Sequence, residues 1–138
     1  MFKNKLFQTL SILLFSVASL GLLAGCAAKL PEGFDEAEVK TAAENVITLL
    51  DEGDGDGLTA LMTDEMKAAI TEDVQAQIFT LVDSLGAYQK ISEMKTGGST
   101  QNEITYAVVV SKVSYEKGEI TYTISFDSMM RLAGLFLK

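Results

Sequence analysis

The chain has no histidine and no tryptophan, and it has a single cysteine and a single proline among its 138 residues. The side chain that proteins use most often as a general base is therefore missing. The cysteine has no second cysteine to pair with, no imidazole to activate it and no partners for a zinc site. No G-x-S-x-G, S-x-x-K or glycine-rich phosphate loop occurs either. We therefore expect no cofactor, no metal and no enzyme active site of these kinds.

Basic residues are also scarce, since 11 lysines and arginines stand against 19 aspartates and glutamates. Two of the lysines lie in an N-terminal leader, so the rest of the chain has nine basic residues and a formal charge of −10. A surface of that sign repels nucleic-acid phosphates and anionic lipid headgroups. We expect no nucleic-acid partner, and we expect membrane attachment only through a separate anchor.

The one long apolar run stands near the N-terminus. Residues 1–8 carry two lysines, Leu10–Leu23 is almost wholly apolar, and Leu23-Ala24-Gly25-Cys26 closes the segment. This order is typical of a secretory signal, and the run is shorter than the roughly 20 residues of a membrane span. The tetrapeptide resembles the lipobox of bacterial lipoproteins. That resemblance implies cleavage of a signal peptide, residues 1–25, and attachment of diacylglycerol to Cys26.

A lipidated Cys26 would place the protein at the cell membrane, on the extracytoplasmic side. Two acyl chains supply stable anchoring that one chain does not. Residues 26–33 would then be the lipidated cysteine and a short tether of about 25 Å, at about 3.3 Å per residue. The alternative is an uncleaved N-terminal anchor helix, which would also hold the chain at a membrane. In both cases the folded part, residues 34–138, stays close to the bilayer.

The first half of that folded part has helical patterns. Apolar residues recur at spacings of three and four from Phe34 to about Asp51, which predicts an amphipathic helix. Residues 58–62 predict a short helical turn, and Thr63 is placed to cap a second helix. A third helix is predicted to start after Thr71 and to stop at Gly86.

The second half has the period of β-strands. Residues 120–126 alternate between apolar and polar, and residues 104–115 are apolar on both faces in their middle, as in a central strand. Turns are predicted at 116–118, 127–130 and 97–102, so that 88–96 is a polar edge strand and 132–137 a last strand. Helices followed by such strands predict an α+β domain, with N-terminal helices packed on a curved four-stranded antiparallel sheet.

This order of elements resembles the NTF2-like (cystatin-like) superfamily. Gly86, Tyr106–Val110, Tyr115–Gly118 and Leu132–Phe136 resemble the small bacterial family catalogued as DUF3887. The resemblance spans about residues 34–138 and implies a cone-shaped fold with a cavity between helices and sheet, without an assigned activity. The chain is thus interpreted as a lipoprotein with a non-catalytic binding or interaction domain. Its partner would be a small apolar ligand or an envelope protein.

Candidate residues for the cavity are aromatic, because a tyrosine offers an apolar ring and one hydrogen-bonding tip. The candidate lining residues are Tyr88, Tyr106, Tyr122 and Phe126, and their alternative role is to fill the core. A homodimer through the open face of the sheet, around residues 121–125, is a further prediction.

The competing hypothesis is a small pocket enzyme, similar to an isomerase or a dehydratase. Some NTF2-like enzymes use an aspartate base in an apolar pocket, and Asp83 and Asp127 are the acids nearest to apolar runs. The alternative for both is exposure to solvent.

The segment Asp51–Gly57, DEGDGDG, looks like a calcium loop. An EF-hand loop starting at Glu52 would have oxygen ligands at positions 1, 3 and 5 and glycine at position 6. Position 12, which needs a bidentate glutamate, is Thr63. We therefore interpret the segment as a helix stop followed by a helix cap, with left-handed glycines at Gly53 and Gly55 and with Asp56 as the cap.

Overall fold

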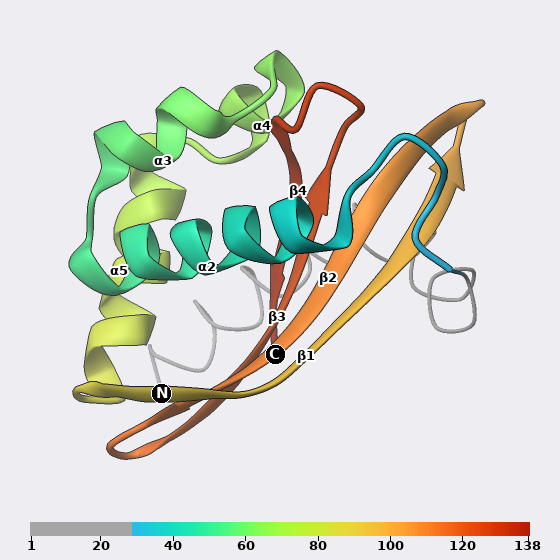
Figure 1. Cartoon of the computed structure of the whole chain (residues 1–138). Coiled ribbons are helices and arrows are strands. Elements are labelled where there is room, and N and C mark those ends of the chain that lie inside the picture. The colour runs from blue at the N-terminus through green and yellow to red at the C-terminus, as the bar shows by residue number, and fades with distance from the viewer. Residues whose placement is uncertain (1–28) are drawn as a thin grey trace.

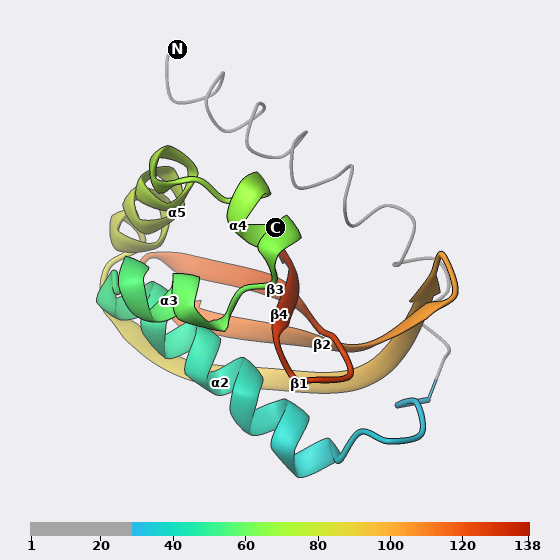
Figure 2. The ribbon, with the colours of Figure 1, turned by 90° about the horizontal axis from the view of Figure 1, so that it is seen from above.

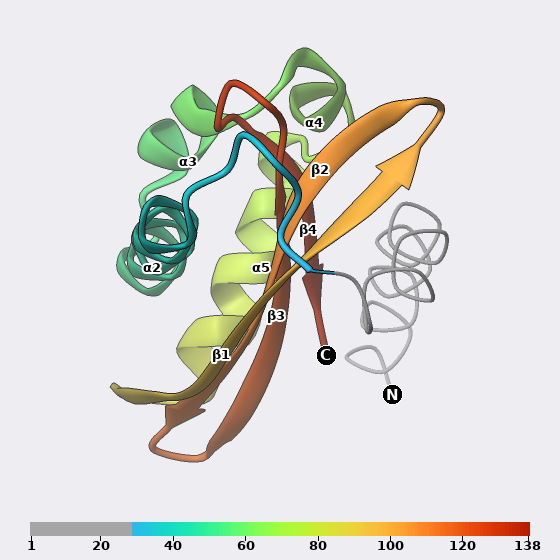
Figure 3. The same ribbon diagram turned by 45° about the vertical axis from the view of Figure 1, so that its right-hand side comes forward.

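The computed structural model describes residues 29–138, so the predicted signal peptide, residues 1–25, and Cys26 lie outside the described residues. Within this part the strands form one antiparallel sheet in the order β1-β2-β3-β4. Figures 1 and 3 show the helices gathered on one face of the sheet, and the predicted α+β class is confirmed. The elements in chain order are α2 (Glu36–Glu52), α3 (Gly55–Leu61), α4 (Asp64–Ala69), α5 (Glu72–Ser84), β1 (Tyr88–Gln101), β2 (Ile104–Tyr115), β3 (Gly118–Phe126) and β4 (Leu132–Leu137).

Each helix begins at a side-chain cap. Asp35 caps α2 by accepting a hydrogen bond from the Glu38 N–H, and Thr63 and Thr71 cap α4 and α5 in the same way. Such caps satisfy backbone donors that the first turn of a helix leaves unpaired. At the other end of α5, Gly86 has a φ of 80°, which permits the chain to leave the helix. The predicted caps at Thr63 and Thr71 and the predicted stop at Gly86 are confirmed.

The acidic loop connects α2 to α3, and two parts of its prediction are wrong, namely the cap at Asp56 and the left-handed conformation of Gly55. Gly53 ends α2 in the left-handed region, with a φ of 69°, as expected. The cap of α3 is Asp54, whose Oδ1 accepts the Gly57 N–H at 2.9 Å, whereas Asp56 lies inside the first turn. Gly55 is helical rather than left-handed. The helix starts three residues earlier than the apolar pattern indicates, because α3 begins with residues of no apolar periodicity.

A single apolar core fills the space between the helices and the sheet. Helix α2 contributes a buried stripe at spacings of three and four, from Val39 to Leu50, and α5 contributes Ile78 and Val82. Complete burial of one such side chain contributes about 1.5–3 kcal/mol. The sheet adds alternate residues of its strands, which is the arrangement expected when only one face of a sheet is packed. Within residues 29–138 no helix is both long enough and apolar enough to cross a membrane.

Alternation along the strands separates the two faces of the sheet. The even-numbered residues from Ile120 to Phe126 in β3 are buried among the core, and the odd-numbered residues from Thr121 to Ser125 are only half-buried. The register extends this division to β2, where Ala107 pairs with Phe126 and Val108 with Ser125. Thr121, Thr123 and Ser125 therefore lie on the open face, the one away from the described helices.

The predicted turn at 97–102 is wrong, because most of it belongs to β1. This strand continues to Gln101, and Gly97 and Gly98 pair with Val108 and Ala107. The turn consists of Asn102 and Glu103, whose φ angles of 50° and 67° suit a two-residue hairpin loop. β1 is nevertheless the edge strand that the sequence predicts.

The β1–β2 hairpin extends past the rest of the sheet. Pairing of β2 with β3 ends at Ala107, while pairing of β1 with β2 continues to Gln101 and Ile104. The hairpin arm, which we define as residues 99–106, projects from the body in Figure 1, and Figure 2 shows β1 bending along its length. The sheet is therefore curved, as the sequence predicts.

Candidate functional site

The helix-facing side of the sheet contains a buried pair of tyrosines. The hydroxyls of Tyr115 and Tyr122 lie 2.6 Å apart, which is a hydrogen bond, and the two residues are 3% and 0% exposed. The ring of Tyr88 meets that of Tyr115 edge to face, with centroids 6.2 Å apart. Such a contact is a favourable arrangement of aromatic quadrupoles. The three residues come from β1, β2 and β3, so the sheet register brings them together.

Burial controls the proton affinity of this pair. It raises the pKa of Tyr122 far above that of an exposed tyrosine, and the hydrogen bond to Tyr115 raises it further. Burial also raises the pKa of Tyr115, and the hydrogen bond to Tyr122 opposes that rise. The carboxylate of Asp51, at the end of α2, adds a smaller effect that raises the pKa of both. Both hydroxyls are therefore neutral at physiological pH.

The four predicted lining residues do not gather at one place. Tyr122 and Phe126 lie on the helix-facing side of β3, 0% and 2% exposed, within the core. Tyr88 joins Tyr122 through Tyr115 but is 42% exposed. Tyr106 precedes the buried Ala107 in β2 and pairs with Ser99, so it lies on the open face at the hairpin arm.

Tyr115 is a member of this cluster that is absent from the residues predicted to line a cavity. Its signal was present in the sequence, since it shares the odd-numbered parity of Ala107, Val109 and Val113, which are all completely buried. In the sequence it stands beside the turn at 116–118, where an exposed residue is the usual expectation. In the structure the hairpin turn packs against the end of α5, where the Lys117 N–H donates to the Leu85 carbonyl at 2.8 Å. Tyr115, beside this turn, is therefore buried.

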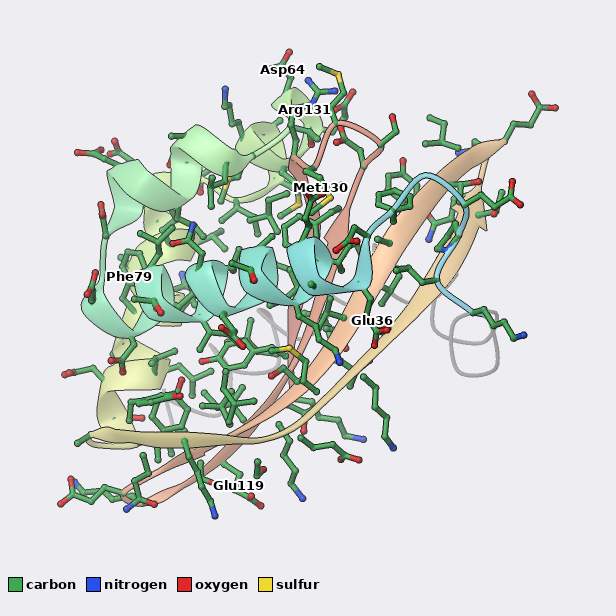
Figure 4. All side chains as sticks on the ribbon, viewed as in Figure 1. Glu36, Asp64, Phe79, Glu119, Met130 and Arg131 are labelled. Atoms are coloured by element: carbon green, nitrogen blue, oxygen red, sulfur yellow. The ribbon has the colours of Figure 1, made fainter. Side chains whose placement is uncertain are left out.

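The two candidate catalytic aspartates lie apart from these tyrosines. Asp83 is exposed on α5. Asp127 is 8% exposed, and its carboxylate accepts hydrogen bonds from the backbone N–H groups of Met129 and Arg131 and from the Arg131 Nε at 2.8 Å. Figure 4 shows Arg131 on the loop between β3 and β4, near Asp64 of α4. Asp83 is therefore exposed to solvent, which was the alternative to a catalytic role. Asp127 is buried and binds the backbone of the loop between β3 and β4.

One carboxylate of the acidic loop, that of Asp54, binds the backbone. Asp54 caps α3, and the position of a Cβ on Gly57 would lie 2.6 Å from its Oδ2. A Cβ on Gly55 would lie 2.7 Å from the Oε1 of Gln75 on α5. Among residues 29–138 no group of three or more Cys, Asp or Glu side chains is arranged to hold a metal ion. Gly55 and Gly57 therefore have packing reasons that require no ion, and Gly53 has a conformational one, its φ of 69°.

The open face carries a mixture of lysines, hydroxyls and apolar side chains. Lys95 lies opposite Val110, Val110 opposite Thr123, and Thr123 opposite Phe136, so one row crosses all four strands. Val110, Thr123 and Phe136 are half-buried, and Lys95 is exposed. None of the described helices covers this row (Figure 3).

The described part of the predicted tether packs on the domain. Leu30 and Phe34 contact the core, and the Phe34 N–H donates to the Pro31 carbonyl at 3.4 Å. The ring of Pro31 lies against Gly98, where a Cβ would come within 2.6 Å of its Cγ and 3.1 Å of the Lys29 carbonyl oxygen. Glycine inside a strand often marks such a close approach of another segment. The chain therefore enters the domain at the base of the hairpin arm.

Comparison with known families matches residues 43–135 to the family described as a protein of unknown function, DUF3887. The chain belongs to the DUF3887 family. The matched part of this DUF3887 protein runs from the middle of α2 into β4, so it includes the tyrosine cluster and both candidate aspartates. No curated protein matches it.

Among solved structures, the DUF3887 protein is similar to an NMR structure of a protein from Ruminococcus gnavus ATCC 29149. The TM-score is 0.69 and the identity 23%, over 78% of this chain and 94% of that one. At this identity the similarity shows a shared fold alone.

Proposed function

We propose that this DUF3887 protein is a lipoprotein anchored through Cys26 to the extracytoplasmic side of the cell membrane, with a non-catalytic, NTF2-like domain that binds a ligand or an envelope partner. The observation that carries the proposal is the tetrapeptide Leu23-Ala24-Gly25-Cys26 directly after the apolar run. The folded chain supports it, because the Lys29 carbonyl, three residues after Cys26, lies against Gly98 of the domain. A signal peptide and an anchor would thus be followed at once by the folded domain.

The anchor is tested by lipid labelling in a bacterial host that processes lipoproteins. Cys26→Ala is expected to lose labelling by a radioactive fatty acid and to leave the membrane fraction or keep its signal peptide. Ala28→Ser, which leaves the cysteine and the preceding tetrapeptide intact, serves as the matched control and is expected to label normally. Normal labelling of Cys26→Ala would refute the assignment.

The non-catalytic part of the proposal is supported by the two candidate bases. Asp83 is exposed, and the carboxylate of Asp127 is engaged in three hydrogen bonds inside its loop. The assignment to an NTF2-like fold is supported by a curved antiparallel sheet with helices on one face (Figure 2). The sequence, which has no histidine and no nucleophile motif, also supports a non-catalytic domain.

The ligand is sought by native mass spectrometry of the protein isolated from its host membrane. An apolar ligand held by the domain would add a fixed mass to the lipidated chain. Detection of the lipidated mass alone, across lipid extracts and growth medium, would count against a small-molecule ligand and leave an envelope protein as the partner.

A further inference from the structure

We propose that the hairpin arm is the part of the domain that touches the lipid bilayer, with Ile104 at the level of the headgroups, while the end of α5 points away from the membrane. The inference rests on the lipid anchor proposed above, and it adds an orientation and a contact residue to that anchor. Its observations are the short chain between the anchor and the domain, the position of the arm, and the distribution of charge.

The chain between the proposed anchor and the domain is short. The Pro31 ring and the Lys29 carbonyl lie against Gly98, at the base of the hairpin arm. Cys26 precedes Lys29 by three residues, so their Cα atoms are at most about 11 Å apart, at about 3.6 Å per residue. Acyl chains on Cys26 would therefore hold this end of the domain next to the headgroups.

The hairpin arm projects at this same end. Figures 1 and 2 both show the arm and the entering chain at one end of the molecule, and α3 and α5 at the other. The tip of the arm, where Gln101 pairs with Ile104, is three residues beyond Gly98, or about 10 Å at about 3.3 Å per residue. The arm is thus about as long as the chain from Cys26 to Lys29, so its tip reaches the surface that holds the acyl chains.

The arm has few charges and an exposed apolar side chain near its tip. Glu103 is the single charged residue among residues 99–106, and Figure 3 shows the arm projecting beyond the described helices. Ile104 is 52% exposed, and the exposed Thr100 and Thr105 have hydroxyl oxygens 3.3 Å apart. Removal of the Ile104 side chain from water is favourable, and threonine hydroxyls can donate hydrogen bonds to phosphate and ester oxygens. The tip therefore suits the boundary between water and lipid.

The distribution of charge favours the same orientation. The helical part, residues 36–84, has a formal charge of −10, of which residues 51–84 contribute −8 with nine carboxylates and one lysine. Residues 29–40 and the arm together have five carboxylates and two lysines, a formal charge of −3. Since the Debye length is about 8 Å at physiological ionic strength, an anionic bilayer acts mainly on the end that is near it. An arm directed at the lipid keeps the most acidic part of the domain in solution.

The orientation is tested on the full lipidated protein with one introduced thiol. Acylation blocks Cys26, which is the single cysteine, so Thr105→Cys on the arm and Ser84→Cys at the end of α5, both at exposed positions, each take one nitroxide label. The protein is reconstituted in vesicles of phosphatidylglycerol and phosphatidylcholine that contain a gadolinium-chelating lipid. The nitroxide at position 105 is expected to relax several-fold faster than the nitroxide at position 84, because β1 alone spans roughly 40 Å at about 3.3 Å per residue. Equal or reversed rates would overturn the proposal.

The contact residue is tested by a matched pair of substitutions. Ile104→Ser removes the exposed apolar side chain of the arm, and Met129→Ser removes one that is 71% exposed in the loop between β3 and β4. The first is expected to lower the ratio of the relaxation rate at position 105 to that at position 84, because the arm loses its apolar contact with the lipid. The second is expected to leave the ratio unchanged. Equal effects of the two substitutions would overturn the assignment of Ile104 to the headgroup region.

Failure of the anchor and failure of the orientation are distinguishable. The mass of the purified protein reports acylation independently of the relaxation rates. An unmodified Cys26 would refute the anchor and this inference with it, whereas an acylated protein with equal or reversed rates would overturn the orientation alone. A second copy bound to the arm would broaden the nitroxide signal at position 105 without gadolinium, and dilution with unlabelled protein would sharpen it. That result would replace the bilayer by a second copy as the partner of the arm and overturn the proposal.

Discussion

Removal of one hydroxyl from the tyrosine pair tests the buried hydrogen bond directly. In Tyr122→Phe the hydroxyl of Tyr115, which is 3% exposed, loses the partner that lies 2.6 Å away. A buried polar group left without a partner costs about 1–3 kcal/mol. The ring is retained, so no cavity forms. We expect the free energy of unfolding to fall by about that amount, and the midpoint temperature by roughly 4–8 °C per kcal/mol.

The double variant Tyr115→Phe with Tyr122→Phe gives the sharper result. Both hydroxyls are absent from it, so no buried polar group remains unpaired, and replacing both partners can be nearly neutral. Its loss of stability is expected to be smaller than the sum of the two single losses, with a coupling energy of about 0.5–3 kcal/mol. Urea unfolding of residues 29–138, followed by circular dichroism, measures all three variants. Additive losses would show that the two hydroxyls do not interact.

The same pair predicts a loss of stability at alkaline pH. In the folded state burial raises the pKa of Tyr122 and of Tyr115, whereas in the unfolded state both titrate at about 10. The unfolded state therefore releases protons first, and the stabilising contribution, complete below about pH 10, is lost as the pH rises toward the folded-state values. The double phenylalanine variant is expected to show a shallower decline above pH 10. Identical slopes for this variant and the wild type would refute the reasoning.

Three other predictions concern the loops and the edge strand. Gly98→Ala is expected to cost about 1–3 kcal/mol by overpacking against the Pro31 ring and to speed proteolysis near Lys29; Gly118→Ala, whose Cβ would lie 3.4 Å from Leu85, is the mild control. Asp127→Ala, measured by urea unfolding, should lose about 1–3 kcal/mol because its loop donors lose their acceptor, whereas an equal loss in exposed Asp83→Ala would contradict that explanation. Addition of calcium or of a chelator should leave the melting temperature unchanged, and a clear rise with calcium would refute the assignment of the acidic loop to helix capping.

Local signals in the sequence predict most of the elements. The caps at Thr63 and Thr71 and the stop at Gly86 depend on side chains within a few residues of each helix end, so they are visible without tertiary contacts. The strand over 104–115 is predicted with its observed bounds, because β-branched residues and a turn at each end mark it.

Two of the errors, at Gly55 and at Gly97–Gly98, share one physical origin, which is that glycine has several uses. Gly97 and Gly98 predict a turn because glycine tolerates positive φ, but Gly98 is needed for the absence of a Cβ beneath Pro31. Gly55 is likewise helical and makes room for Gln75. Whether a glycine forms a turn or makes room for a neighbour depends on residues distant in the sequence, here Pro31 for Gly98 and Gln75 for Gly55. A local sequence pattern does not show which distant residues will pack there.

The α+β class, the order of the elements and the expectation of a lipid anchor at Cys26 follow from the amino-acid sequence alone, because composition and periodicity are local properties. Which tyrosines meet follows from the three-dimensional arrangement. Strand register places Tyr115 beside Tyr122 and puts Tyr106 on the other face. The same arrangement gathers the charge of −10 in the helical layer rather than spreading it over the whole surface. A net charge is a sum over the chain, whereas the field that a bilayer meets depends on which face carries each charge.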